Sequence, residues 1–200
     1  MRLMPSFTLA ALLASVALVP GGALAEQTGE RFHLSLPIDW REVARNRVQG
    51  AEVVAYAPVG QDASTWTDML TVQVFPDMTA LPASSFYERT RTTYRETCQA
   101  TRGGTMQSGL SNGYPSAFWV LGCGRHGPTG VGETSFFRLI QGDHALYLAQ
   151  RAWRTAPYPA DQPPPVPADQ QQQAVTLLGT FGVCDPTVPD HPCPAAAPAR

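Results

Sequence analysis

The sequence predicts an α+β fold in which a mostly antiparallel sheet is covered by two helices, an α/β/α sandwich. Short runs with a strand pattern come first, then an amphipathic helix, then more strands and a last helix, an order typical of this class. The run Ala117–Cys123 is apolar on both of its alternating faces, so both sides of the sheet need a cover. The length of 200 residues suits one domain with a sizeable core.

Residues 1–25 have the three parts of a secretory signal peptide. Arg2 is the short basic start, Phe7–Val19 is the apolar run, and Ala23–Ala25 fits the small-x-small cleavage pattern. The apolar run is too short for a stable membrane anchor, and no cysteine follows the cleavage site to carry a lipid. We therefore expect a mature chain that begins at Glu26, has no membrane span and no lipid anchor, and is periplasmic or secreted.

Three strands are expected before the first helix. Phe32–Leu36 alternates apolar and polar residues and is ended by Pro37. Ala51–Ala57 and Met69–Phe75 follow as a hairpin joined by a polar loop. The arginine-rich stretch Arg41–Arg47, which lies between the first two strands, is expected to be a loop.

The first helix is expected to run from Ser85 to about Thr101. Ser85 and Glu88 have the spacing of a capping box, and Gly103-Gly104 is a stop signal. At 100° per residue one side of this helix is apolar and a neighbouring stripe is basic. The apolar side contains Phe86, Tyr87, Tyr94 and Cys98, and the basic stripe contains Arg91, Arg95 and Arg102.

A meander of three strands is predicted for the stretch from Tyr114 to Trp153, after a further strand over Thr105–Leu110 and an Asn-Gly turn. The dipeptide Gly142-Asp143 indicates a two-residue hairpin between the second and third strands. That turn would place Leu139 opposite Leu146. The three strands are Ala117–Cys123, Thr134–Gln141 and His144–Trp153.

The chain after the meander has three parts. Residues 156–168 form a stiff proline-rich connector, and a last helix follows that Asp169 can cap and Gly182 can end. We expect residues 26–183 to form a single globular domain and residues 184–200 to form a disulfide-tied, proline-rich tail.

The four cysteines of an exported chain indicate two disulfides. We expect Cys98–Cys123, because Cys98 lies on the sheet-facing side of its helix and Cys123 ends the central strand. We also expect Cys184–Cys193, which would hold the tail. The alternative is a metal or redox site with Cys184, His191 and Cys193, but their spacing matches no compact zinc pattern and no Cys-x-x-Cys occurs.

The start of the chain carries a family resemblance. Phe32–Pro37, followed by Trp40, resembles the opening of PsbP-like and DcrB-like domains, with a short strand, a proline and a tryptophan shortly after. The later order of elements is also similar, so the resemblance covers roughly Arg31 to Phe181. It implies an α/β/α sandwich used mainly for binding and assembly, with no shared catalytic residues. The chain departs from DcrB in lacking a lipid-anchor cysteine, and from both in its four cysteines and proline-rich connector.

The segment Gly127–Thr134 matches the phosphate-binding loop G-x-x-x-x-G-K-[ST] at every fixed position except Glu133, which stands where lysine belongs. Thr134–Ile140 has the composition of a strand, whereas such a loop opens a helix. A formal charge of −2 gives no attraction to nucleic acid. We expect no metal, no cofactor and no nucleic-acid partner.

The first function that the sequence favours is an exported, non-enzymatic binding or assembly module of the bacterial cell envelope. Its partner would be an envelope protein or ligand of unknown identity. The candidate docking surface is Trp40 with Arg41, Arg45 and Arg47, because tryptophan and arginine are enriched at binding hot spots. The alternative for Trp40 is a core position, with the arginines only solvating a loop.

The second function is a periplasmic hydrolase. No Gly-x-Ser-x-Gly and no His-Glu-x-x-His motif occurs, so its site would be assembled from distant residues. Candidates are His126, Asp143 and His144.

Overall fold

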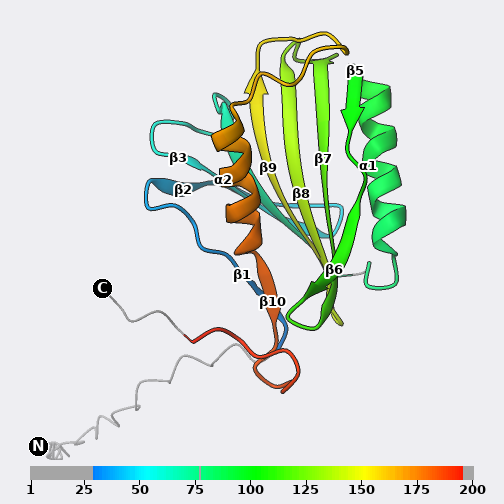
Figure 1. Ribbon diagram of the computed structural model, residues 1–200. Coiled ribbons are helices and arrows are strands. Elements are labelled where there is room, and N and C mark those ends of the chain that lie inside the picture. The colour runs from blue at the N-terminus through cyan, green and yellow to red at the C-terminus, as the bar shows by residue number, and fades with distance from the viewer. Residues whose placement is uncertain (1–28, 77, 196–200) are drawn as a thin grey trace, which may run out of the picture.

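The computed structural model describes residues 29–76 and 78–195, so the expected signal segment lies outside the described residues. Figure 1 shows the arrangement of the elements. In chain order they are β1 (Arg31–His33), β2 (Trp40–Val48), β3 (Ala51–Pro58), β4 (Asp68–Phe75), α1 (Ala83–Thr97), β5 (Cys98–Gly103), β6 (Gln107–Ser111), β7 (Tyr114–His126), β8 (Gly132–Gln141), β9 (Leu146–Thr155), α2 (Ala168–Gly179) and β10 (Gly182–Cys184).

An eight-stranded antiparallel sheet carries one helix on each face, which confirms the predicted α+β class. The strand order is β2-β3-β4-β9-β8-β7-β5, with β6 also paired to β7. In Figure 1, α2 crosses the front of the sheet near β9, and α1 lies beside β5 and β7. A separate ribbon of two strands joins β1 to β10.

The central strand β7 contributes to two hydrophobic cores, as its two-faced pattern predicts. Trp119 and Leu121 are buried on the α1 side, against Phe137 of β8 and residues of α1. Phe118 and Val120 pack into the other core, which α2 covers. Alternation along one strand therefore separates the two layers.

The prediction of a loop at Arg41–Arg47 is wrong, because these residues belong to β2, the nine-residue edge strand. Most of β2 is exposed, and polar side chains occupy both of its faces. The pairing with β3 also shifts between Glu42 and Ala44, where a β-bulge interrupts the alternation. An exposed, bulged edge strand lacks the apolar periodicity by which a strand is recognised in a sequence.

The predicted bounds of the first helix are also wrong at both ends. α1 starts at Ala83 with Pro82 as its N-cap and no side-chain capping bond, so the Ser85 capping box does not form. It ends at Thr97, because the next residues pair with β7 as β5. A disulfide ties the first residue of β5, Cys98, to β7. The expected apolar side is confirmed, since aromatic residues of α1 pack on Trp119.

The β8–β9 hairpin has a longer turn than the sequence predicts. Leu139 pairs with Leu148 instead of Leu146, so the register differs by two residues and every side chain keeps its face. The physical reason is Glu30, whose carboxylate accepts hydrogen bonds from the backbone N–H groups of residues 143, 144 and 145, at 2.6, 3.1 and 3.2 Å. The same carboxylate leaves no space for a Cβ atom at Gly142.

Replacing Glu30 by glutamine is expected to lower the free energy of unfolding by about 1–2 kcal/mol, because a neutral amide is a weaker acceptor than a carboxylate for three N–H donors. Urea titration would measure the loss, and hydrogen exchange should show faster exchange of the turn amides at residues 143–145. The matched control is Glu88→Gln, which weakens only an exposed ion pair on α1. Equal effects of the two changes would contradict the capping role.

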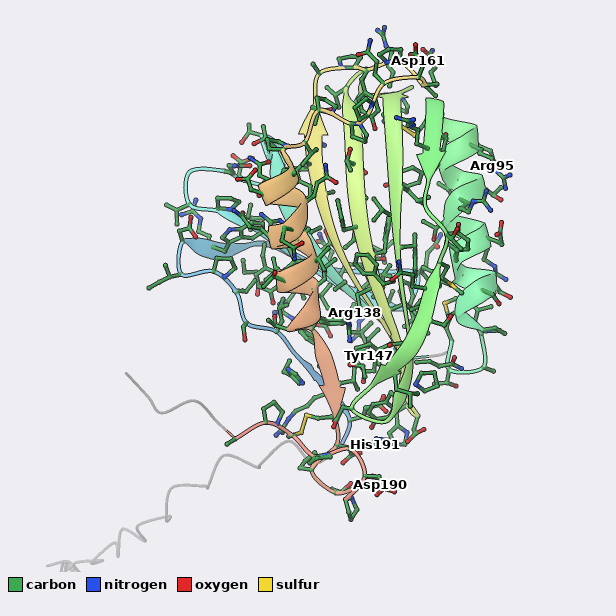
Figure 2. All side chains as sticks on the ribbon, in the orientation of Figure 1. Arg95, Arg138, Tyr147, Asp161, Asp190 and His191 are labelled. Carbon is green, nitrogen blue, oxygen red and sulfur yellow. A yellow bond between two sulfur atoms is a disulfide. The ribbon has the colours of Figure 1, made fainter. Side chains whose placement is uncertain are left out.

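Residues 182–195 form a short strand and a loop after α2. Gly182–Cys184 was not expected as a strand, yet it pairs with β1 as β10. The loop that follows folds back, and the His191 ring stacks on Tyr114 with ring centres 3.8 Å apart. Figure 2 shows His191 and Asp190 in this loop below β10. α2 starts at Ala168 with Pro167 as its N-cap, so Asp169 does not cap it.

Candidate functional site

A groove with a volume of about 620 Å³ lies between α2 and the segment that leads into β2. This volume is within the usual range of ligand sites. One wall is formed by backbone and side chains of residues 35–37, and the opposite wall by α2. The lining residues from the second wall are Gln172, Gln173, Thr176, Leu177 and Thr180.

The base of the groove holds a buried ion pair between β4 and β9. Arg151 donates two hydrogen bonds to the Asp68 carboxylate, from Nε at 3.1 Å and from Nη2 at 2.8 Å. The side chains of Arg151 and Asp68 are only 7% and 18% exposed. Such a bidentate pair fixes the guanidinium plane and cancels its charge within the groove.

Two indole rings hold the Arg151 guanidinium in place. Its carbon lies 4.6 Å from the ring centre of Trp153 and 5.2 Å from that of Trp40. Trp40 is partly buried against the α2-side core and also lines the groove. The position of the Trp40 ring is therefore fixed, because the ring packs on the Arg151 guanidinium, which is itself held by Asp68.

Exposed apolar side chains stand beside the groove. Ile38 is 98% exposed and Val59 is 65% exposed. The backbone N–H of Val59 donates to the carbonyl of Asp39 at 2.7 Å, so the two side chains belong to the same end of the β2–β3 hairpin. A contiguous exposed apolar patch with a polar rim marks a contact surface, and tryptophan is enriched among the residues that dominate binding.

The structure separates the arginines that were grouped with Trp40. The register pairs Arg41 with Ala57 but Arg45 with Val54, so these two arginines lie on opposite faces of β2. Arg45 already bonds to the carboxylates of Glu42 and Glu52, and the Glu42 hydrogen bond is the main cause that raises its pKa. Arg41, Arg45 and Arg47 are all exposed.

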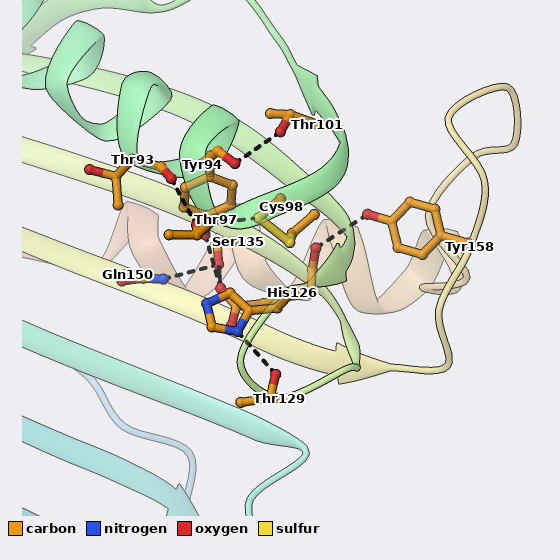
Figure 3. The surroundings of a disulfide bond; sticks show 12 residues. Thr93, Tyr94, Thr97, Cys98, Thr101, His126, Thr129, Ser135, Gln150 and Tyr158 are labelled. Carbon is orange, nitrogen blue, oxygen red and sulfur yellow. Dashed lines mark hydrogen bonds between the residues drawn. A yellow bond between two sulfur atoms is a disulfide. The ribbon is translucent and has the colours of Figure 1, made fainter.

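A second hollow, about 330 Å³, lies beside α1 on the opposite face of the sheet. Two residues of its lining, Tyr94 and Gln150, belong to a hydrogen-bond network. Tyr94 and Ser135 each donate a hydrogen bond to Glu133 at 2.9 Å, and Gln150 donates to Ser135 at 3.0 Å. Figure 3 shows this network beside the disulfide of Cys98. Burial raises the pKa of Tyr94 well above its usual value, so this hydroxyl acts as a donor.

Glu133 belongs to the segment that resembles a phosphate loop. In the structure this segment forms the hairpin turn between β7 and β8 and the start of β8, and no helix follows the turn. The Glu133 carboxylate serves the hydrogen-bond network, which is a structural role.

The residues named for a hydrolase are not brought together. His126 ends β7 and contacts Thr129, whereas Asp143 and His144 lie in the turn at the opposite end of β8. The ten residues of β8 separate the two places by roughly 30 Å. Within residues 29–76 and 78–195, no group of three or more His, Cys, Asp or Glu side chains is placed to hold a metal ion.

Both disulfides in the structure are the pairs expected from the sequence. Cys98 joins Cys123 with Cα atoms 5.3 Å apart, and Cys184 joins Cys193 at 4.9 Å. His191, the third residue of the alternative metal site, instead contacts the Asn112 carbonyl through Nδ1 at 2.8 Å. Two disulfides fit a protein that folds in an oxidising compartment.

Comparisons with known proteins give likenesses of fold. No family model matches the sequence. No curated protein matches it either. Among solved structures, the chain is similar to PsbP of the cyanobacterium Synechocystis, with 12% identity, a TM-score of 0.46, and coverage of 82% of this chain and 98% of that one. The sequence resemblance to PsbP-like domains led us to expect this likeness.

Two further solved structures have a similar fold. LpqN of Mycobacterium tuberculosis, described as involved in cell envelope biogenesis, has 9% identity and a TM-score of 0.38, and the match covers 80% of this chain and 87% of that one. The Ran-binding protein Mog1p of Saccharomyces cerevisiae has 8% identity and a TM-score of 0.43, with coverage of 78% and 95%. None of the helices in the described part of this chain is long and apolar enough to cross a membrane.

Proposed function

We propose that the protein is an exported, non-enzymatic binding or assembly module of the bacterial cell envelope. The observation that carries this proposal is the end of the β2–β3 hairpin, where exposed Ile38 and Val59 flank the groove of Trp40. Of the five large apolar side chains that are exposed among the described residues, Ile38 and Val59 lie at this end of the hairpin, and Val48 lies at its other end, next to the turn. Apolar side chains gathered at one edge, with arginines beside them, favour contact with a partner.

The contact surface in this proposal follows the edge strand β2, from Trp40 and Arg41 at its start to Arg45 and Arg47 near its end. Their exposure leaves the guanidinium groups accessible, and Arg45 is held in a fixed position by two carboxylates. Fixed side chains lose less conformational entropy when a partner binds. The groove beside them would receive a ligand or a projecting group of the partner.

A photo-crosslinking residue in place of Ile38 is expected to give one covalent adduct in the native envelope. The control position is Val175, which is exposed on α2 and does not line the groove, and the same residue there should give no adduct. Changing Arg41, Arg45 and Arg47 together to serine should abolish the adduct and leave the melting temperature nearly unchanged, since exposed ion pairs contribute little. Gel mobility and mass spectrometry would detect the adduct. The same adducts from both positions would rule this surface out.

Export is tested on the intact protein. The mature chain is expected to begin at Glu26, and its mass should lie four hydrogen masses below that of the reduced chain because both disulfides are closed. Intact-mass spectrometry before and after reduction measures both features. A retained N-terminal segment, a lipid-modified mass or four free thiols would contradict export of this protein in soluble form.

A further inference from the structure

The chemistry of the Trp40 groove indicates the class of ligand that it takes. Its two ionic groups at the base, Arg151 and Asp68, neutralise each other. The remaining ionic residue in the lining is Asp39, which is exposed at the rim. A groove with this balance attracts neither a phosphate nor a carboxylate, because no cation is left without its counter-charge inside it.

The wall from α2 presents uncharged polar groups in a short row. Gln172, Gln173 and Thr176 are exposed and line the groove. Each amide carries donors and an acceptor, and a threonine hydroxyl can act as either. A ligand that fits this wall therefore has several groups that both donate and accept hydrogen bonds, as neighbouring hydroxyls do.

The opposite side of the groove is apolar and aromatic. Trp40 is the aromatic ring in the lining, and Leu36, Pro37 and Pro58 also line the groove. An aromatic face carries partial negative charge and attracts the C–H groups of a flat apolar surface. The ring is held by the Arg151 guanidinium, so it is ready for stacking without a change of rotamer.

We propose that this groove binds an uncharged saccharide, with one sugar ring stacked on Trp40 and its hydroxyls hydrogen-bonded to Gln172, Gln173 and Thr176. A sugar ring combines an apolar C–H face with a rim of hydroxyls, and the groove combines an aromatic face with a rim of amides and hydroxyls. The cavity of about 620 Å³ is large enough for a short oligosaccharide segment. This inference rests on the proposed function, because it names the ligand class of the same binding surface.

The test uses the exported, disulfide-bonded protein and three uncharged probes: cellotetraose, maltotetraose and the tetramer of N-acetylglucosamine. The chain has four tryptophans, so the indole N–H signals can be followed one by one by NMR. We expect at least one probe to shift the Trp40 signal in a saturable way and to leave the signal of Trp119, buried on the α1 side, unchanged. Trp40→Phe assigns the signal.

Variants on the exposed wall keep the test independent of folding. Gln173→Ala and Thr176→Ala are each expected to weaken probe binding about fivefold, the effect of losing one hydrogen bond. Gln170→Ala removes an amide from the same helix that does not line the groove, and it should leave the affinity unchanged. Equal affinity in all three variants would overturn the proposal.

Two outcomes separate the saccharide site from the proposed function. The saccharide site is rejected if none of the three sugars shifts the Trp40 signal. It is also rejected if an uncharged alanine–proline tetrapeptide shifts the signal and the sugars do not. In either case an adduct at position 38 would still support a binding module. If mass spectrometry shows that a bound tetrasaccharide is cleaved, the saccharide site is supported and the non-enzymatic function is contradicted.

Discussion

Replacing Arg151 by alanine is expected to lower the free energy of unfolding by about 3–5 kcal/mol. The change removes the cation that accompanies the largely buried Asp68 carboxylate and takes away the group that packs between Trp40 and Trp153. A carboxylate without its partner in a buried site keeps the full cost of desolvation. Urea unfolding followed by circular dichroism would measure the loss.

The neighbouring Arg154 is the matched control. Its guanidinium carbon lies 4.0 Å from the ring centre of Trp66, but this pair is partly exposed. Arg154→Ala is therefore expected to cost less than about 1 kcal/mol. Changing Arg151 and Asp68 together to leucine should recover most of the loss, because an apolar pair replaces the ions without leaving a lone charge. A loss for Arg151→Ala no larger than that for Arg154→Ala would refute the buried-pair argument.

The second large effect is expected from the Cys98–Cys123 disulfide, which joins the start of β5, directly after α1, to β7. Replacing Cys98 and Cys123 by alanine should cost about 3.5 kcal/mol by the chain-entropy relation, and replacing Cys184 and Cys193 about 2.6 kcal/mol. The sequence separations are 25 and 9 residues, so the first bond restricts the unfolded chain more. Unfolding in urea under non-reducing conditions gives both values.

Hydrogen exchange distinguishes the two disulfides by the segment in which each one slows exchange. Loss of the Cys98 bond should increase exchange along the last turns of α1 and in β5, because this bond fixes the junction between them. Loss of the Cys193 bond should affect only the loop that carries His191. A larger loss of stability on removing the Cys184–Cys193 bond than on removing the Cys98–Cys123 bond would contradict this order.

Two features that follow from a local pattern were predicted correctly, although the local capping signals at Ser85 and Asp169 were not. The alternation of Ala117–Cys123 gave a strand covered on both faces, and the aromatic side of the helix gave its packing surface. Other errors occur where a distant residue decides the local structure. The register of the β8–β9 hairpin depends on Glu30, more than 100 residues away along the chain. No pattern within the hairpin contains that information.

The candidate site was only partly visible in the sequence. Trp40 was singled out by composition and does line the groove. Arg151 was missed, although an arginine between Leu148 and Trp153 in a strand with two apolar faces is itself a signal. A charge on a covered strand requires a counter-charge on a neighbouring strand. Which carboxylate supplies it depends on the pairing of β4 with β9, and the sequence does not specify that pairing.

The pairing of β1 with β10 has a consequence for how the protein acquires its structure. These strands bring together residues about 150 positions apart, among the longest loops that the chain can close. The residues of β1 therefore have no strand partner until Gly182–Cys184 has been synthesised. High contact order of this kind delays completion of the fold. A chain of this kind therefore remains incompletely folded for longer after its synthesis.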